Sequence, residues 1–250
     1  VPPLVEYAGW ILKGLRRGRT RRRCEAVAPR FLDGDAPLFL FPLQLPGDYQ
    51  ILLHAPGGDL FALVAATIAS FARHASAEAR LLFKVHPLDN GLSRWPERIA
   101  AMAAERGIAD RVGTVDGGAL DAMIARASGV VTINSTVGTA TLAAGKPLIA
   151  LGNAIFDRPG LTHSGSLAEF WRAPEPPDPE LVEAFFRLLV DRLQVRGGFV
   201  GRAAIEAGAV AVAERIVAPE EAFGMENRRA RRQTFRRAAE LFGETPASPA

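Results

Sequence analysis

The sequence is poor in residues that bind metals or form cross-links. It has one cysteine, Cys24, and four histidines among 250 residues. A single cysteine excludes an internal disulfide and fits a reducing compartment. Because these residues lack the spacing of zinc ligands, we expect no metal site.

Long apolar segments are also absent. No apolar run approaches the ~20 residues of a membrane-spanning helix, and Lys146-Pro147 interrupts the nearest candidate, residues 142–151. The sequence opens with Val1 rather than Met, and nothing resembles a signal peptide. We therefore interpret its start as that of a fragment or a processed chain.

Several common functional motifs are missing. The sequence has no Gly-x-Gly-x-x-Gly, no Walker A motif, no Gly-x-Ser-x-Gly and no internal repeat. The sequence therefore gives no motif-based support for dinucleotide binding, for a P-loop NTPase or for an α/β-hydrolase.

The net charge of +3 is unevenly distributed. Residues 11–30 carry eight Lys or Arg and one Glu, and residues 225–240 carry six Arg and two Glu. The rest of the chain, with 16 basic and 24 acidic residues, is near −8. The basic flanks indicate either an anionic partner, such as a phospholipid surface or nucleic acid, or solvated arginines on exposed helices. They lack interleaved aromatic residues, which argues against nucleic acid.

Apolar runs and amphipathic segments alternate along the chain. This order predicts an α/β fold with a doubly wound, mostly parallel sheet. We expect strands at 38–43, 80–85, 112–115, 129–133 and 148–151. We expect helices at 4–28, 57–75, 96–106, 119–127, 181–195, 203–217 and 220–242, and a capped turn from Ser166 to Glu169.

The stretch 131–150 is the centre of the functional hypothesis. A buried strand runs into Asn134-Ser135-Thr136, and a short helix follows. The first turn of a helix has unpaired N–H groups that favour an anion. We expect this turn to hold the phosphate of a nucleotide-sugar, although helix capping alone also explains Ser or Thr there.

Two further polar loops follow apolar strands. The loop 44–50 contains Asp48, which is either a nucleophile or base, or only a turn residue. The loop 86–91 begins with His86, which either bonds a phosphate oxygen or satisfies local backbone groups. In a parallel sheet the three loops gather at one edge, which predicts a site there.

At these loops the sequence resembles the capsule polysaccharide biosynthesis family of β-Kdo transferases, of the KpsS/KpsC type. Residues 41–51 resemble its (V/F)PLQxxxDxQI segment, 84–91 its K-x-HP-x-D-x-G, and 132–138 its TxNSTVG. Residues 156–162 and 167–171 resemble YDxPGLT and LxxFW. The PLQ and NSTVG segments favour the KpsS branch.

The resemblance implies a GT-B-type, retaining, metal-independent glycosyltransferase. It would transfer Kdo from the donor substrate CMP-Kdo, without a cofactor, to a phosphatidylglycerol-type phospholipid and so begin the capsule linker. The implied catalytic residues are Asp48 and Gln44, of which Asp48 would be the nucleophile and Gln44 would position it. The implied CMP-Kdo-binding residues are Lys84, His86, Pro87, Asn134, Ser135 and Thr136.

The resemblance also implies an organisation and a location. Residues 1–30 would be a basic helix, the remnant of or link to a missing N-terminal half. Residues 31–217 would be a Rossmann-like nucleotide-sugar-binding domain, the C-terminal half of the GT-B fold. From composition rather than from the resemblance, residues 218–250 would be a basic helix followed by a disordered tail rich in Pro, Ser and Ala. The protein would be cytoplasmic and peripheral at the anionic inner membrane, with other capsule assembly proteins as partners and no nucleic acid.

Two alternatives stay open at this point. One is another GT-B nucleotide-sugar enzyme, resembling a sialyltransferase or an epimerase. The other is a non-catalytic module of capsule export or assembly. The activity of a chain that lacks one half is itself open.

Overall fold

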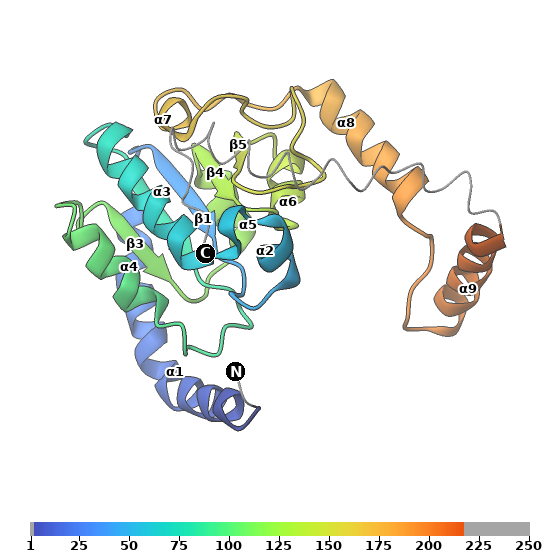
Figure 1. The fold of residues 1–250 in the computed structure, drawn as a ribbon, viewed down its shortest axis with the longest axis horizontal. Helices are drawn as coiled ribbons and strands as arrows, with labels where there is room; N and C mark the ends of the chain where they lie inside the picture. Colours follow the sequence, from blue (N-terminus) through green and yellow to red (C-terminus); the bar gives the residue numbers. More distant parts are fainter. Residues whose placement is uncertain (1–2, 218–250) are drawn as a thin grey trace. The chain divides into compact units, whose positions relative to one another are not determined.

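The computed structural model describes residues 3–217, which form two compact units, 3–177 and 178–217. The helix expected at 220–242 and the tail after it lie outside the described residues. The first unit begins with α1 (Pro3–Leu32) and contains a sheet of β1 (Leu38–Pro42), β2 (Arg80–Lys84), β3 (Val112–Val115), β4 (Gly129–Thr132) and β5 (Leu148–Ala150) (Figure 1).

The five strands are all parallel and run in the order β3-β2-β1-β4-β5. The chain moves outward from β1 to β2 and β3, then crosses to β4 and β5. The connecting helices of the first unit are α2 (Tyr49–His54), α3 (Leu60–His74), α4 (Trp95–Ala104), α5 (Leu120–Arg126), α6 (Val137–Ala143) and α7 (Leu167–Phe170). Because right-handed crossovers in opposite directions place helices on opposite faces, the sheet is doubly wound. The predicted fold class is therefore confirmed.

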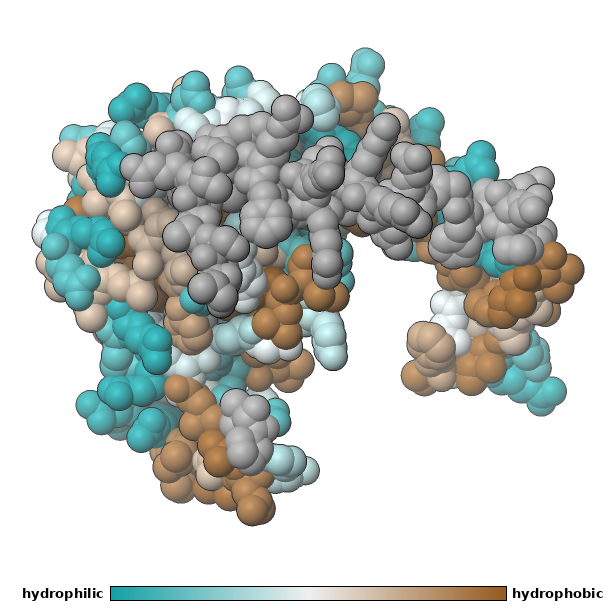
Figure 2. Space-filling model, viewed as in Figure 1, coloured by the Kyte–Doolittle hydropathy of each residue, from teal (hydrophilic) through white to brown (hydrophobic). Residues whose placement is uncertain are grey.

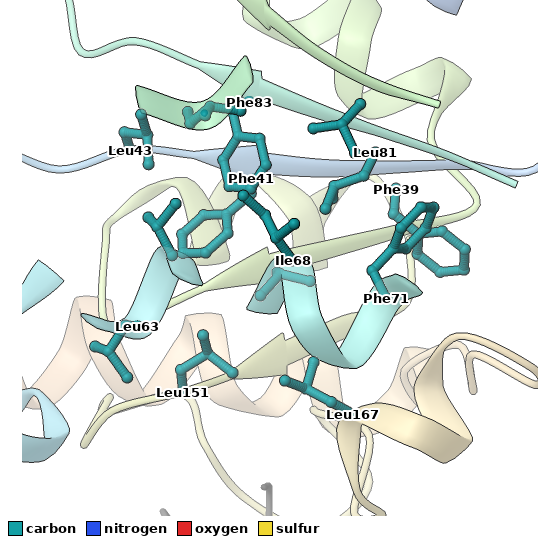
Figure 3. Close-up of a cluster of buried hydrophobic side chains, with 14 of the residues drawn as sticks. Phe39, Phe41, Leu43, Leu63, Ile68, Phe71, Leu81, Phe83, Leu151 and Leu167 are labelled. Atoms are coloured by element: carbon teal, nitrogen blue, oxygen red, sulfur yellow. The ribbon is translucent and has the colours of Figure 1, made fainter. Parts of the chain in front are cut away.

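Alternating strand residues supply two buried faces. On one face, Phe39 and Phe41 pack in a single core with Phe71 of α3 and Phe83 of β2 (Figure 3). The Phe39 ring lies 4.9 Å from that of Trp171, in an edge-to-face arrangement. On the other face, α5 packs on β1, and α6 packs on β4 and β5. This double burial explains why the strands read as continuous apolar runs rather than as alternating patterns.

Helix α1 is held to the edge of the sheet at β3. Phe31, which is 3% exposed, packs on Gly113, where a Cβ would lie 2.5 Å from its ring. Only glycine leaves room for an aromatic ring at this distance. Within residues 3–217, none of the helices is both long enough and apolar enough to cross a membrane.

The helix bounds differ from expectation in two places. The loop expected at 44–50 already contains the first turn of α2, which sequence periodicity missed because only Ile51 of its six residues is buried. The helix expected from 57 begins at Leu60, after a 3-10 turn, η1 (Pro56–Gly58). Gly57 and Gly58 have φ of 68° and 63°, which an α-helix does not allow. The capped turn at Ser166 is confirmed, with both hydrogen bonds of the capping box present.

The second unit contains α8 (Pro179–Leu188), the π-helix η2 (Leu189–Leu193) and α9 (Arg202–Val217). The single helix expected at 181–195 is thus α8 followed by a π-helical turn. Asp178 begins α8 by accepting hydrogen bonds from the N–H groups of Glu180 and Leu181. The prediction placed these helices within one domain of 31–217; in the structure they belong to a compact unit of their own that begins at Asp178.

Candidate functional site

The strand order creates a switch point between β1 and β4. Successive strands leave β1 on one side and β4 on the other, so the loops at their carboxyl ends diverge. In open α/β sheets, ligands bind in the crevice that this divergence leaves. The loop after β1 begins at Leu43 and the loop after β4 begins at Ile133, so the predicted residues Gln44 and Asn134 flank this point.

Gln44 and Asn134 bond directly to each other across the switch point. Gln44 Nε2 donates to Asn134 Oδ1 at 2.9 Å, and the backbone N–H of Asn134 donates to Gln44 Oε1 at 3.4 Å. Asn134 Nδ2 donates to the carbonyl of Gln50, on α2, at 2.9 Å. Gln44 is buried, with 6% of its surface exposed. The pair therefore fixes the first and third predicted loops to each other.

The backbone determines the orientation of both amides. The N–H of Asn134 can only donate, so Gln44 must turn its oxygen toward it and its nitrogen toward Asn134 Oδ1. The carbonyl of Gln50 can only accept, so Asn134 must turn its nitrogen toward α2. Each side chain therefore has one arrangement that satisfies all three bonds.

Asp48 lies at the start of α2, in the same network. Its Oδ1 accepts from the N–H of Gln50 at 2.9 Å, which makes it the N-cap of the helix. Gln44 bonds to Asn134 rather than to Asp48, so the two predicted catalytic side chains are connected through α2 and Asn134. The structure thus gives Asp48 a capping role, and the proposed chemical role remains a prediction.

Ser135 and Thr136 differ in what their side chains do. Ser135 Oγ accepts from the N–H of Val137 at 3.2 Å and so completes the turn into α6. Thr136 occupies the N-cap position, but its exposed side chain makes no capping hydrogen bond. Capping therefore does not explain Thr136, which is exposed.

His86 follows β2, next to β1 in the sheet. The N–H of Leu43 donates to the carbonyl of Lys84 at 2.8 Å, so the loops after β1 and β2 start side by side. His86 Nδ1 accepts from the N–H of Leu88 at 3.1 Å. A neutral imidazole that accepts at Nδ1 carries its proton on Nε2, which makes Nε2 a donor. His86 thus satisfies the local backbone and also keeps one N–H for a ligand.

Asp89 and Gly91 of the same motif build the loop. Asp89 is buried, and its Oδ1 accepts from the N–H of Gly91 at 2.7 Å. Gly91 has a φ of 82°, which favours glycine. These two residues therefore explain the D-x-G part of the motif as a turn that holds His86 and Pro87 in place.

Lys84 points into a separate cavity of about 800 Å³ between α1 and the carboxyl ends of β2 and β3. Pro87, Lys13 and Asp116 also line it. Lys13 Nζ lies 3.6 Å from Asp116 Oδ2. Burial lowers the pKa of the Lys84 ammonium, and the charge of Asp116 partly opposes this shift. The predicted donor-binding residues are therefore divided between this cavity and the switch point.

Sequence reasoning missed what the loop after β5 contributes. The N–H of Asn153 donates to the carbonyl of His54 at 3.0 Å, which fixes the loop to α2. Phe156 is 2% exposed and packs on Gly138 of α6, where a Cβ would lie 2.2 Å from its ring. The glycine of the NSTVG segment is thus explained by a residue of the next motif along the chain.

The described residues contain no group of three or more His, Cys, Asp or Glu placed to hold a metal ion. The chemistry that the site offers is therefore that of amides, hydroxyls, one imidazole N–H and one carboxylate. Such a set can bind a polar, anionic ligand at the switch point.

Comparison with known proteins identifies the family. The family model for the capsule polysaccharide biosynthesis protein matches residues 1–200. The chain belongs to this family. It is 33% identical over 194 residues to the capsule polysaccharide export protein KpsS of Escherichia coli, covering 77% of this chain and 50% of that protein. The resemblance inferred from the motifs is therefore confirmed.

Two other relatives extend the comparison. The capsule polysaccharide modification protein LipB of Neisseria meningitidis is 34% identical over 162 residues, which cover 64% of this chain and 39% of LipB. The solved structure of the β-Kdo 2,7 transferase KpsC of Thermosulfurimonas dismutans is 21% identical, with a TM-score of 0.40, over 69% of this chain and 60% of that one. This capsule family member spans half or less of the length of KpsS and LipB.

Proposed function

We propose that this chain is the donor-binding half of a GT-B-type glycosyltransferase that transfers Kdo from CMP-Kdo to a phosphatidylglycerol-type phospholipid. Membership of the capsule polysaccharide biosynthesis family supports a role in making the capsule. The observation that carries the proposal is the Gln44–Asn134 pair, which joins two motif loops at the switch point of the sheet. The donor is a substrate, and no cofactor takes part.

The donor phosphate would lie at the carboxyl ends of β1, β2 and β4. His86 Nε2 would donate to a phosphate oxygen, and the hydroxyls of Ser135 and Thr136 would donate to others. Lys84 and Pro87 border the cavity of about 800 Å³, which is large enough for part of a nucleotide-sugar. Gln44 and Asn134 would keep the two loops at a fixed separation, so that the donor groups need little rearrangement.

Asp48 would act as the nucleophile of a double displacement. A carboxylate oxygen would attack the anomeric carbon of Kdo as the bond to the CMP phosphate breaks, forming a glycosyl ester. The acceptor hydroxyl would then displace the carboxylate, losing its proton to solvent or a base, with net retention. The hydrogen bond from Gln50 to Asp48 Oδ1 would orient the carboxylate.

We propose that the contacts with the acceptor lipid come from another part of the family's fold. The relatives KpsS and LipB are at least twice as long as the matched segment. We therefore expect the 250 residues to bind the donor, and transfer to require contacts from that further part. Other capsule assembly proteins and an anionic inner-membrane surface are the proposed partners.

Donor binding is the first test. We expect CMP to bind, measured by calorimetry, and UDP to bind at least tenfold more weakly. His86→Asn keeps an acceptor for the Leu88 N–H but removes the ring N–H, and it should weaken CMP binding about tenfold. Absence of CMP binding at millimolar concentration, or a preference for UDP, would contradict the proposal.

Transfer is the second test, in a protein that includes the family's further part. Asp48→Asn should preserve the cap on α2 and abolish Kdo transfer to a short-chain phosphatidylglycerol. The matched control is Asp59→Asn at the N-cap of α3, where Oδ1 accepts from Phe61 and Ala62. Transfer by the Asp48 variant at the level of this control would exclude Asp48 as the nucleophile.

A further inference from the structure

The N-terminal half of α1 carries apolar side chains that the fold leaves uncovered. Leu4, Ile11 and Leu15 are 83%, 66% and 79% exposed, and their helical spacing places them on one side of the helix. Figure 2 shows apolar side chains gathered on this end of α1. The opposite side contacts the fold, where Lys13 Nζ donates to the carbonyls of Pro87 and Asp89 at 3.3 and 2.5 Å. The apolar stripe therefore faces away from the sheet.

The loop after β2 extends this apolar surface. Leu88 and Leu92 are 62% and 39% exposed. Leu92 contacts α1 directly, since a Cβ built on Gly9 would lie 3.0 Å from its side chain. Helix and loop thus lie in contact next to the carboxyl ends of the strands, and each carries exposed apolar side chains.

The second half of α1 is strongly basic. From Lys13 to Arg23 the helix carries seven Lys or Arg and no Asp or Glu. Arg23 Nη1 lies 3.5 Å from Glu97 Oε1, and Lys13 forms an ion pair with Asp116. The side chains that form no ion pair with another described residue are those of Arg16, Arg17, Arg19 and Arg22. Arg16, Arg19 and Arg23 also line a groove of about 620 Å³ together with Arg94 of the neighbouring loop.

We propose that α1 and the loop 88–92 form a docking surface for an anionic lipid bilayer. The apolar half and the two leucines would enter the interface, while the unpaired arginines contact headgroup phosphates. An apolar face alone would fit several occupants, but the adjoining basic run favours phosphate. A symmetric dimer through this face would set the same arginines against one another. This inference rests on the proposed function for its lipid acceptor and names the surface that would bring the site to it.

Tryptophan fluorescence provides a local probe of docking. Trp10, on α1, is 39% exposed, whereas Trp95 and Trp171 are 1% and 3% exposed. Vesicles of phosphatidylglycerol and phosphatidylcholine should bind the chain and shift the Trp10 emission to shorter wavelength. Vesicles of phosphatidylcholine alone should bind at least tenfold more weakly, and added salt should weaken binding. Trp10→Phe should remove the emission shift, and the variant should still sediment together with the vesicles.

Two variants separate the apolar and the basic contributions. Ile11→Asn should reduce partitioning at least tenfold, and the pair Arg19→Gln with Arg22→Gln about 25-fold, at about fivefold per arginine. The matched control is Arg73→Gln, an exposed arginine on α3, which should leave partitioning unchanged. All these positions are exposed, so circular dichroism should remain that of the unsubstituted chain.

Several outcomes would overturn the inference. Partitioning unaffected by the α1 variants, equal binding to both vesicle types, or an unchanged Trp10 emission on bound vesicles would each do so. A dimer that Ile11→Asn dissociates would assign the face to a second copy. CMP binding without vesicle binding would refute this inference alone, whereas vesicle binding without CMP binding would refute the proposed function alone.

Discussion

The Gln44–Asn134 pair gives the sharpest prediction about the site. The 2.9 Å bond between the amides has good geometry, whereas the 3.4 Å bond to the backbone lies near the outer limit. We therefore count one full hydrogen bond, with a net value of about 1 kcal/mol. Asn134→Ala also removes the bond to the Gln50 carbonyl and leaves the buried Gln44 amide without its partner.

A double-mutant cycle measures the pair. Gln44→Ala should lower the free energy of unfolding by about 2 kcal/mol and Asn134→Ala by about 3 kcal/mol. The double variant should lose about 1 kcal/mol less than their sum, because the shared bond is lost only once. Urea unfolding followed by tryptophan fluorescence reports the unit of residues 3–177, where all three tryptophans lie.

The cycle has a clear opposing outcome. A coupling energy within 0.3 kcal/mol of zero, which is typical of independent sites, would mean that the two side chains do not bond in solution. The amide orientations deduced from the backbone would then be wrong. CMP affinity should fall in both single variants if the pair fixes the separation of the loops, and unchanged affinity would show that it does not.

Three further predictions concern stability. Gly138→Ala should cost about 1–3 kcal/mol in urea unfolding, because its methyl group overlaps a packed ring, whereas Gly14→Ala on exposed α1 should be neutral or stabilising. Burial lowers the pKa of Lys84, so between that lowered pKa and about 10.5 the unfolded state binds more protons than the folded state. The contribution of Lys84 to the free energy of unfolding therefore rises with pH in this range. Lys84→Met should flatten this rise, and an unchanged slope would contradict it. Hydrogen bonds from the backbone and side chain of Ser166 lower the pKa of Glu169, so its contribution is present above about 4.5 and is lost as the pH falls through its folded pKa. Glu169→Gln should remove that part of the acid dependence.

Much of the fold followed from local pattern. The continuous apolar runs at 38–43 and 129–133 indicated strands buried on both faces, and the alternation with helices indicated a parallel sheet. The structure confirms both points. α2 was missed because a six-residue helix with one buried side chain has no periodicity to detect.

The sequence predicted where the candidate site lies, but not which of its side chains bond to each other. The sequence alone determined that three polar loops follow parallel strands and so share one edge of the sheet, because the direction of every strand is set by its connections. Only the tertiary structure decided that Gln44 bonds to Asn134, 90 residues away in the chain, and that Lys84 turns toward α1. Likewise, the sequence predicted a helix at 4–28, but only packing decided that Leu4, Ile11 and Leu15 lie on its exposed side. Local propensity fixes the type of an element, whereas the partner of a side chain depends on which distant segments the fold brings within hydrogen-bond distance.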